Sequence, residues 1–262
     1  MAEITAAMVK ALRDDTGQGM MECKKALQET DGDVQAAKDL LRKKGLMKAE
    51  TKADRATSEG LIAVKALDGA AVMVEARCET DFCARNEEFQ AMVGKLADLA
   101  ADAPAGEIAA TDAMEQAVQD AFAKIGENMS YGRGIKIEAA RIGTYLHHNK
   151  KVGVLLGVDG KVTDETLTDL CMHIAFNNPM GIGPDDIPAD VLEKERSFAR
   201  QQAIDSGKPA EIAEKIVEGK MRKFLAGNAL LEQPFVRDDK KKVKDLLGGA
   251  TIAAFARFAV GT

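Results

Sequence analysis

The sequence has 262 residues, of which 46% are hydrophobic and 30% are charged, and its formal net charge is −6. This length and hydrophobic content suffice for one large domain or for two to three small modules. The acidic balance argues against non-specific nucleic-acid binding, which needs a basic face to displace counterions from phosphates. No apolar run has the length of a membrane span, and the N-terminus lacks the basic and apolar regions of a signal peptide. We therefore expect a cytoplasmic protein that contacts neither nucleic acid nor membrane directly.

Residues 1–54 are predicted to form three short helices. Thr5 is a good N-cap for the first of them, and the second is expected over residues 20–28. The third carries apolar residues from Val34 onward and is expected to stop at Gly45, because Gly is favoured just beyond a helix C-terminus. Three helices of this length form a minimal bundle, which is viable when it is tethered or bound.

The periodicity changes to that of strands after a polar linker over residues 46–58, which is expected to hold some helix. Alternating apolar positions predict strands over residues 59–66 and 71–76. Between them, Asp68-Gly69 is a strong signal for a β-hairpin. Helical spacing of apolar residues then predicts one helix from Asn86 and another over residues 112–125.

The order of hairpin and helix occurs twice, at about residues 59–103 and 135–178. In the second copy, residues 135–145 and 152–158 are the expected strands, and a helix follows them. We interpret the two copies as related α+β subdomains with antiparallel sheets.

Residues 188–226 are predicted to form an antiparallel helical hairpin. Pro188 opens the first helix and Gly207-Lys208-Pro209 separates it from the second, which is the expected placement of Gly and Pro. The chain afterwards returns to strand-like composition at residues 233–236 and 252–260, which can rejoin the second sheet. The predicted apolar stripes are Val191, Leu192, Phe198 and Ile204 on the first helix, and Ile212, Ile216 and Val217 on the second.

The predicted fold class is therefore α+β, with four parts. They are an N-terminal three-helix domain over residues 1–54, a first core subdomain over 55–140, a second over 141–187 and 227–262, and the hairpin insertion over 188–226.

The chemistry of the side chains favours an interaction protein over an enzyme. The four cysteines form no Cys-x-x-Cys pair, so a zinc site is not expected, and the thiols are interpreted as small apolar residues. Phosphate-binding and dinucleotide-binding glycine motifs and a Gly-x-Ser-x-Gly motif are missing. We expect no catalytic residue, no metal and no cofactor. An enzyme that uses Cys171 with His173, or the pair His147-His148, stays open as an alternative, although residues two apart on a helix face different ways.

Phe82 draws attention because it lies beside a carboxylate, Asp81, between a predicted strand and a predicted helix, in a chain that is only 4% aromatic. Such junctions hold side chains on a rigid scaffold and leave them available to a partner. The competing interpretation is that Phe82 fills the core under the following helix, which is the commoner fate of Phe.

Two long segments resemble signatures of a known family. Residues 12–27, LRDDTGQGMMECKKAL, closely resemble the N-terminal signature of bacterial elongation factor Ts, and residues 75–85, EARCETDFCAR, resemble its second signature. Residues 124–128, KIGEN, and 206–209, SGKP, with IAEK following at 212–215, are also similar to family segments. The resemblance runs over essentially the whole chain in the same order. Ala76, Arg77 and Cys83 depart from the usual family pattern, in the strand and turn that support the second signature.

The resemblance implies a guanine-nucleotide exchange factor, not an enzyme, that acts on the GTPase elongation factor Tu. It implies that a bundle similar to ubiquitin-associated folds docks on the GTPase domain and that the core touches this domain and the partner's third domain. It also implies that the hairpin supports homodimer or tetramer contacts in some members. Asp81 and Phe82 would push between helices of the GTPase domain and disturb its magnesium and phosphate site. The implied partner-binding residues are Thr80, Asp81, Phe82, Cys83, Met20, Met21, Lys24, Ile125, Gly126 and His147. An adaptor or chaperone that binds partners without accelerating nucleotide release is the alternative from another class.

Overall fold

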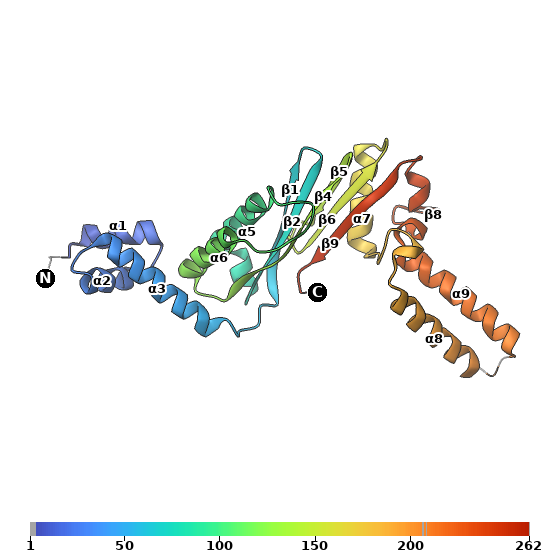
Figure 1. Ribbon diagram of the computed structural model, residues 1–262, viewed down its shortest axis with the longest axis horizontal. Coiled ribbons are helices and arrows are strands. Elements are labelled where there is room, and N and C mark those ends of the chain that lie inside the picture. The colour runs from blue at the N-terminus through green and yellow to red at the C-terminus, as the bar shows by residue number, and fades with distance from the viewer. Residues whose placement is uncertain (1–3, 206, 208, 262) are drawn as a thin grey trace.

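The computed structural model describes residues 4–205, 207 and 209–261. Residues 1–3, Ser206, Lys208 and Thr262 lie outside this description, so the predicted helix break and the SGKP segment are described only in part. The molecule is elongated, with a helical bundle at its N-terminal end, sheets in the middle and a pair of long helices at the other end (Figure 1).

The N-terminal bundle consists of α1 (Ala6–Thr16), α2 (Met20–Glu29) and α3 (Val34–Lys52). Thr5 caps α1 as expected, because its hydroxyl accepts a hydrogen bond from the backbone N–H of Met8 at 3.3 Å. The expected stop at Gly45 is wrong, since α3 runs on to Lys52. A glycine inside a helix costs only about 1 kcal/mol relative to Ala, so a contact made further along the helix can outweigh it. The bundle core contains Val9, Leu12, Cys23, Ala26, Leu27, Ala37 and Leu41.

The first sheet has the strand order β1-β2-β4-β3, and every neighbouring pair is antiparallel. The predicted hairpin is confirmed, because Leu67 pairs with Ala70 across Asp68-Gly69 and Gly69 adopts a φ of 65°. Between bundle and sheet lie the helices α5 and α6, and their inner faces form one core with the strands (Figure 1). The elements are β1 (Glu59–Leu67), β2 (Ala70–Cys78), α4 (Asp81–Arg85), α5 (Glu87–Ala100), β3 (Gly106–Ile108), α6 (Asp112–Ile125) and β4 (Met129–Glu138).

The second sheet has the strand order β5-β6-β9, also antiparallel, and is covered by α7 (Asp164–Asn177). Its strands are β5 (Arg141–Leu146), β6 (Val152–Asp159) and β9 (Thr251–Ala259). The prediction of one strand over residues 135–145 is wrong, because β4 ends at Glu138 and β5 begins at Arg141 in the other sheet. The alternation of Ile135, Ile137 and Ala139 breaks at this corner, because the charged Arg141 takes the next apolar position. The return of residues 252–260 to this sheet is confirmed by β9.

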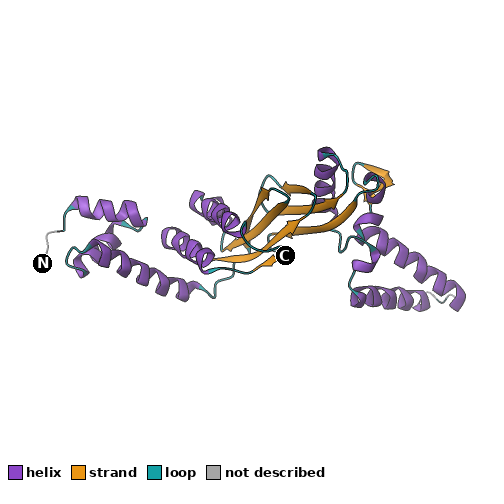
Figure 2. Cartoon of the chain, turned by 45° about the horizontal axis from the view of Figure 1, so that its top comes forward, coloured by secondary structure: helices purple, strands orange, loops and turns teal. Residues whose placement is uncertain are grey.

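The two sheets pack face to face in the middle of the molecule (Figure 2). Between them lies a second core of Ile62, Met73, Ile137, Leu155 and Phe258. β6 contributes glycines at the closest approach: a Cβ on Gly153 would lie 2.7 Å from Met73 Sδ and 2.8 Å from Ile62 Cγ2. The two sheets can therefore pack this closely only because residue 153 is a glycine and has no Cβ.

Two long helices, α8 (Ala189–Asp205) and α9 (Ala210–Asn228), pack on each other through Ala199, Ala203, Val217 and Met221. The predicted stripes are wrong in part, because Phe198 and Ile204 on α8 are each 58% exposed and Ile212 on α9 is 47% exposed. Small alanines form the contact instead, since they let two helix backbones approach closely.

The segment after α9 forms short elements of its own. Residues 233–236 do not rejoin the second sheet as expected; β7 (Pro234–Phe235) pairs with β8 (Asp238–Lys242) in a separate two-stranded sheet. The described part of the chain also holds three short 3-10 helices: η1 (Pro184–Asp186), η2 (Leu230–Glu232) and η3 (Val243–Leu246). The fold is thus α+β with antiparallel sheets, as the sequence indicates. Within the described ranges, none of the helices has both the length and the apolar character needed to cross a bilayer.

Candidate functional site

The predicted contact residues Thr80–Cys83 lie at the start of the short helix α4, directly after β2. Thr80 is the N-cap: its Oγ1 accepts a hydrogen bond from the backbone N–H of Cys83 at 3.1 Å. Asp81 stands in the first turn, where a carboxylate is favoured by the helix dipole, and it forms an ion pair with Arg85 at 2.9 Å. Asn86 then caps α5, so the chain turns from one helix into the next within a single residue.

Phe82 points out of this helix and is 77% exposed, although its neighbours Cys83 and Ala84 are buried in the core under the sheet. The interpretation of Phe82 as a core residue is therefore wrong. Cys83 fixes the helix from beneath, and its side chain does not reach the surface. The surface of α4 thus presents a phenyl ring beside the partly exposed carboxylate of Asp81.

The turn after α6 holds the start of α4. Gly126 ends α6 with a left-handed φ of 78°. The carboxylate of Glu127 accepts the hydroxyl proton of Thr80, and its two oxygens lie 2.9 and 3.1 Å from Thr80 Oγ1. Glu79 accepts one from the backbone N–H of Asn128 at 2.6 Å, and this bond, with Arg55 beside it, holds the pKa of Glu79 below its usual range. The structure therefore places Ile125 and Gly126, which precede Glu127, close to Thr80.

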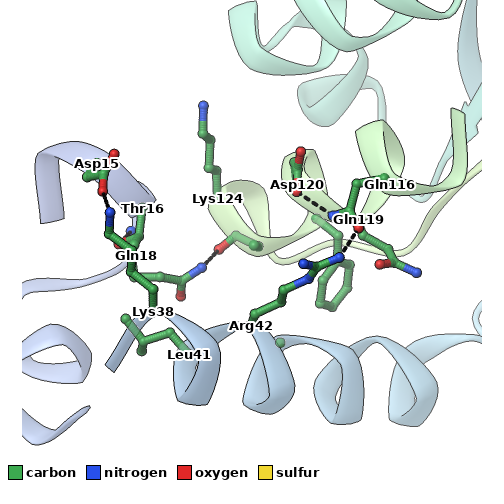
Figure 3. A pocket seen from close by; sticks show the side chains of 13 residues that line it. Asp15, Thr16, Gln18, Lys38, Leu41, Arg42, Gln116, Gln119, Asp120 and Lys124 are labelled. Carbon is green, nitrogen blue, oxygen red and sulfur yellow. Dashed lines mark hydrogen bonds and ion pairs between the residues drawn. The ribbon is translucent and has the colours of Figure 1, made fainter. Parts of the chain in front are cut away.

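The same turn also meets the N-terminal bundle. Lys52 on α3 donates to the backbone carbonyl of Gly126, and Asn128 Nδ2 donates to the carbonyls of Ala53 and Arg55 at 3.1 and 2.8 Å. A cleft of about 380 Å³ lies between the bundle and α6, and Arg42 and Gln116 line it from the two sides. Across it, Gln18 points from the bundle toward α6, where it donates to the Ala123 carbonyl at 2.7 Å (Figure 3). In the same view, Arg42 reaches Gln116 on α6.

His147 lies in the turn between β5 and β6, where its Nδ1 is hydrogen-bonded to the Tyr145 hydroxyl at 2.8 Å. This turn is joined to α4 through one side chain of α5. Gln90 accepts a hydrogen bond from Lys150 Nζ at 2.9 Å and donates one to the Arg85 carbonyl at 3.1 Å. The structure therefore links the turn that carries His147 to the C-terminal end of α4.

The comparisons with known proteins point to one family. A family model described as elongation factor TS matches residues 79–262. The chain is 46% identical over 268 aligned residues to elongation factor Ts of Idiomarina loihiensis, covering 98% of this chain and 91% of that protein. It is 47% identical over 264 residues to elongation factor Ts of Actinobacillus succinogenes, covering 100% of this chain and 92% of that protein.

The chain belongs to the elongation factor Ts family. Its relatives are translation elongation factors, so the chain falls in protein biosynthesis. The range matched by the elongation factor TS model begins at Glu79 and thus contains α4, the turn after α6 and the turn that carries His147.

The remaining predicted contact residues of this elongation factor Ts chain, Met20, Met21 and Lys24, lie on α2. Met20 is 48% exposed, Met21 is 63% exposed and Lys24 is also exposed, while Cys23 packs inward. They belong to the bundle at the N-terminal end of the molecule, whereas α4 belongs to the central part.

Two residues at the site were missed by sequence reasoning. Glu127 lies inside the KIGEN segment. The resemblance of this segment to the family indicated that the turn matters, but it did not indicate that the Glu127 carboxylate contacts Thr80. Gln90 had no signal at all, because a glutamine on an amphipathic helix looks like any solvated position.

The enzyme alternative finds no support in the geometry of Cys171 and His173. Both side chains are fully buried, and burial raises the pKa of the Cys171 thiol to about 12, so it stays protonated at neutral pH. His173 is engaged by Gln233 at 2.8 Å and by the backbone N–H of Val236 at 3.2 Å. Among the described residues, no group of three His, Cys, Asp or Glu side chains is arranged to hold a metal ion.

Proposed function

We propose that the chain is a guanine-nucleotide exchange factor that promotes GDP release from elongation factor Tu. Asp81 and Phe82 would enter the partner near its magnesium and phosphate site. The observation that carries this proposal is the exposure of Phe82 at 77% on a helix whose other apolar residues are buried. Fully burying a Phe side chain contributes about 1.5–3 kcal/mol. An aromatic ring held out in this way favours a protein partner that buries it.

The energetics of exchange fit a wedge of this size. Binding of the factor and binding of nucleotide must oppose each other, and the coupling free energy is the same in both directions. If the burial of Phe82 were gained only with nucleotide-free partner, it would weaken nucleotide binding by roughly ten- to a hundredfold. A larger effect needs further contacts in the same interface.

These further contacts are proposed for two surfaces. Thr80, Ile125, Gly126 and His147 would surround the wedge, while Cys83 would support it from beneath. Met20, Met21 and Lys24 would form a second contact through the bundle, which we propose to be similar to ubiquitin-associated folds. The factor would hold neither nucleotide nor metal itself, and it would act in the cytoplasm as a non-enzymatic binding protein.

We also propose that α8 and α9 are an inserted helical hairpin that supports a homodimer. Its outer surface carries Phe198 and Ile204, which are exposed, whereas its inner surface is closed by alanines. Under this proposal the chain has four parts, with boundaries near residues 54, 140, 187 and 227.

Release of a fluorescent GDP analogue from purified elongation factor Tu tests the function. A large acceleration by catalytic amounts of this chain, measured by stopped flow against unlabelled GDP in excess, is expected. Capture of the same partner with an unchanged release rate would instead identify an adaptor that binds without promoting exchange.

A further inference from the structure

The helix that carries Phe82 is too short to hold its own shape. α4 has five residues, whereas isolated helices shorter than about 12 residues are marginal in water. Its buried residues, Cys83 and Ala84, anchor one side only. Contacts at the two ends of α4 must therefore add to this anchor to fix the direction of Phe82.

At the N-terminal end, Glu127 decides how the Thr80 hydroxyl is used. A threonine hydroxyl has one proton to donate and lone pairs that accept. The Glu127 carboxylate can only accept, and both of its oxygens lie within 3.1 Å of Thr80 Oγ1. The hydroxyl proton is thus directed to Glu127, and a lone pair faces the N–H of Cys83 at 3.1 Å. The cap of α4 is oriented from a turn 47 residues further along the chain.

At the C-terminal end, Gln90 ties the last carbonyl group of α4 to the rest of the core. Its Nε2 donates to the Arg85 carbonyl at 3.1 Å, and its Oε1 accepts from Lys150 Nζ at 2.9 Å. The last carbonyls of a helix have no partner within it, so a side-chain donor at this position stabilises the end. Because the other end of the Gln90 amide is held by Lys150, its donor group is kept aimed at α4.

We propose that Glu127 and Gln90 are positioning residues that hold α4 by its two ends and so fix the direction of Asp81 and Phe82. This inference rests on the proposed exchange function for its role, but not for its geometry. Neither residue belongs to the predicted contact set, and each acts through α4. Their loss leaves Phe82 in the chain and lets α4 sample other orientations, which lowers the speed of exchange more than the affinity for the partner.

Two substitutions at each position separate the hydrogen bond from the bulk of the side chain. Glu127→Gln keeps an acceptor for Thr80 with almost the same shape, whereas Glu127→Ala removes it. Gln90→Glu keeps the acceptor for Lys150 but places a carboxylate oxygen against the Arg85 carbonyl, whereas Gln90→Ala removes both bonds. Gln201→Ala is the matched control, because Gln201 bonds Asp205 on α8, in another part of the molecule.

Hydrogen–deuterium exchange of the peptide that covers residues 79–90 tests the geometry without any partner. We expect Glu127→Ala, Gln90→Ala and Gln90→Glu to exchange three- to tenfold faster in this peptide, with Glu127→Gln close to the unaltered chain and Gln201→Ala identical to it. The melting temperature of each variant, measured in parallel, shows whether the fold is kept. If an alanine variant fails to fold, the two conservative variants decide: Gln90→Glu should exchange faster in this peptide than Glu127→Gln.

GDP release from elongation factor Tu then tests the role. The release rate is measured at increasing concentrations of each variant, which gives a maximal rate and the variant concentration that produces half of it. The maximal rate is expected to fall three- to tenfold for the variants that loosen α4, with the half-maximal concentration changed less than twofold. Unchanged exchange protection of residues 79–90 in all variants overturns the inference. Faster hydrogen exchange with an unaltered maximal release rate also overturns the positioning role. If the unaltered chain itself accelerates no release, the proposed function fails, while the hydrogen-exchange comparison still decides whether the two residues hold α4.

Discussion

Lys52, near the end of α3, donates a hydrogen bond to the backbone carbonyl of Gly126, which ends α6. Its ammonium group also lies 5.9 Å from the centroid of the Phe122 ring. One side chain of the bundle thus reaches the turn that holds the N-terminal end of α4. Together with the hydrogen bonds of Gln18 and Asn128 described above, this lysine joins the position of the bundle to the shape of the proposed contact surface.

Replacing this lysine is expected to loosen the bundle without unfolding the core. Lys52→Met keeps the aliphatic chain but removes the donor and the charge, which contribute about 1–2 kcal/mol together at a partly exposed site. Hydrogen exchange should accelerate in the turn over residues 125–128 and leave the two sheets unchanged. Lys10→Met, on the exposed side of α1, is the control. If residues 125–128 exchange hydrogen equally slowly in both variants, the contact of Lys52 with Gly126 does not stabilise this turn.

The cap of α4 is expected to contribute to stability on its own. Thr80→Val keeps the shape of the side chain but removes the oxygen that accepts from Cys83, and loss of an N-cap costs about 1 kcal/mol. Thr80→Ser keeps the oxygen and should lie within a few tenths of a kcal/mol of the unaltered chain. Urea unfolding measures both, and a Thr80→Val chain as stable as Thr80→Ser would contradict the capping role.

The close approach of the two sheets predicts an unequal response to two glycine substitutions. Gly153→Ala places a methyl group within 2.8 Å of Met73 and Ile62, and overpacking of this kind costs about 1–3 kcal/mol. Gly94→Ala lies on the exposed side of α5, where its new Cβ meets nothing within 4 Å beyond its chain neighbours and its own helix backbone, and it should instead stabilise the chain by up to about 1 kcal/mol. Chemical denaturation gives both values, and a Gly153→Ala chain at least as stable as the parent would contradict the packing described.

His173 is expected to make stability depend on pH. Burial lowers its pKa from the ordinary value of 6.5, so the folded chain keeps the ring neutral. The N–H of Val236 points at Nδ1, which leaves no room for a second ring proton. The unfolded chain binds the proton first as pH falls, so this contribution is complete above pH 6.5 and declines below it toward the lower folded pKa. His173→Gln should flatten the pH dependence of unfolding between pH 7 and 5, and an unchanged slope would contradict it.

The sequence predicts local structure well wherever a short signal decides it. Asp68-Gly69 marks a two-residue hairpin, and Thr5 marks a helix start, because the backbone geometry at these points depends on those residue types. The elongation factor Ts signatures likewise identify the family from residues 12–27 and 75–85 alone.

Long-range choices are not visible in the same way. The break in the apolar alternation at Ala140-Arg141 marks the corner between β4 and β5, but it does not tell which sheet the following strand joins. On α8, the apolar pattern favours Phe198 over Ala199, but helix packing selects the small residue. Glu127 and Gln90 contact α4 only because the fold brings their turns and helices together.

The exposure of Phe82 is matched closely by one other ring. Phe176, at the end of α7, is 78% exposed, and it belongs to none of the predicted contacts. Because both rings face solvent, truncating either one should change the free energy of unfolding by less than about 0.5 kcal/mol. Comparing the two truncations therefore shows whether an effect on exchange comes from losing any exposed ring or from losing the ring on α4.

The most direct test is stopped-flow release of labelled GDP from elongation factor Tu with the unaltered chain, Phe82→Ala and Phe176→Ala. We expect the maximal release rate to fall about ten- to a hundredfold for Phe82→Ala, in line with 1.5–3 kcal/mol of lost burial, and to stay unchanged for Phe176→Ala. Release that is as fast with Phe82→Ala as with the unaltered chain would contradict the account.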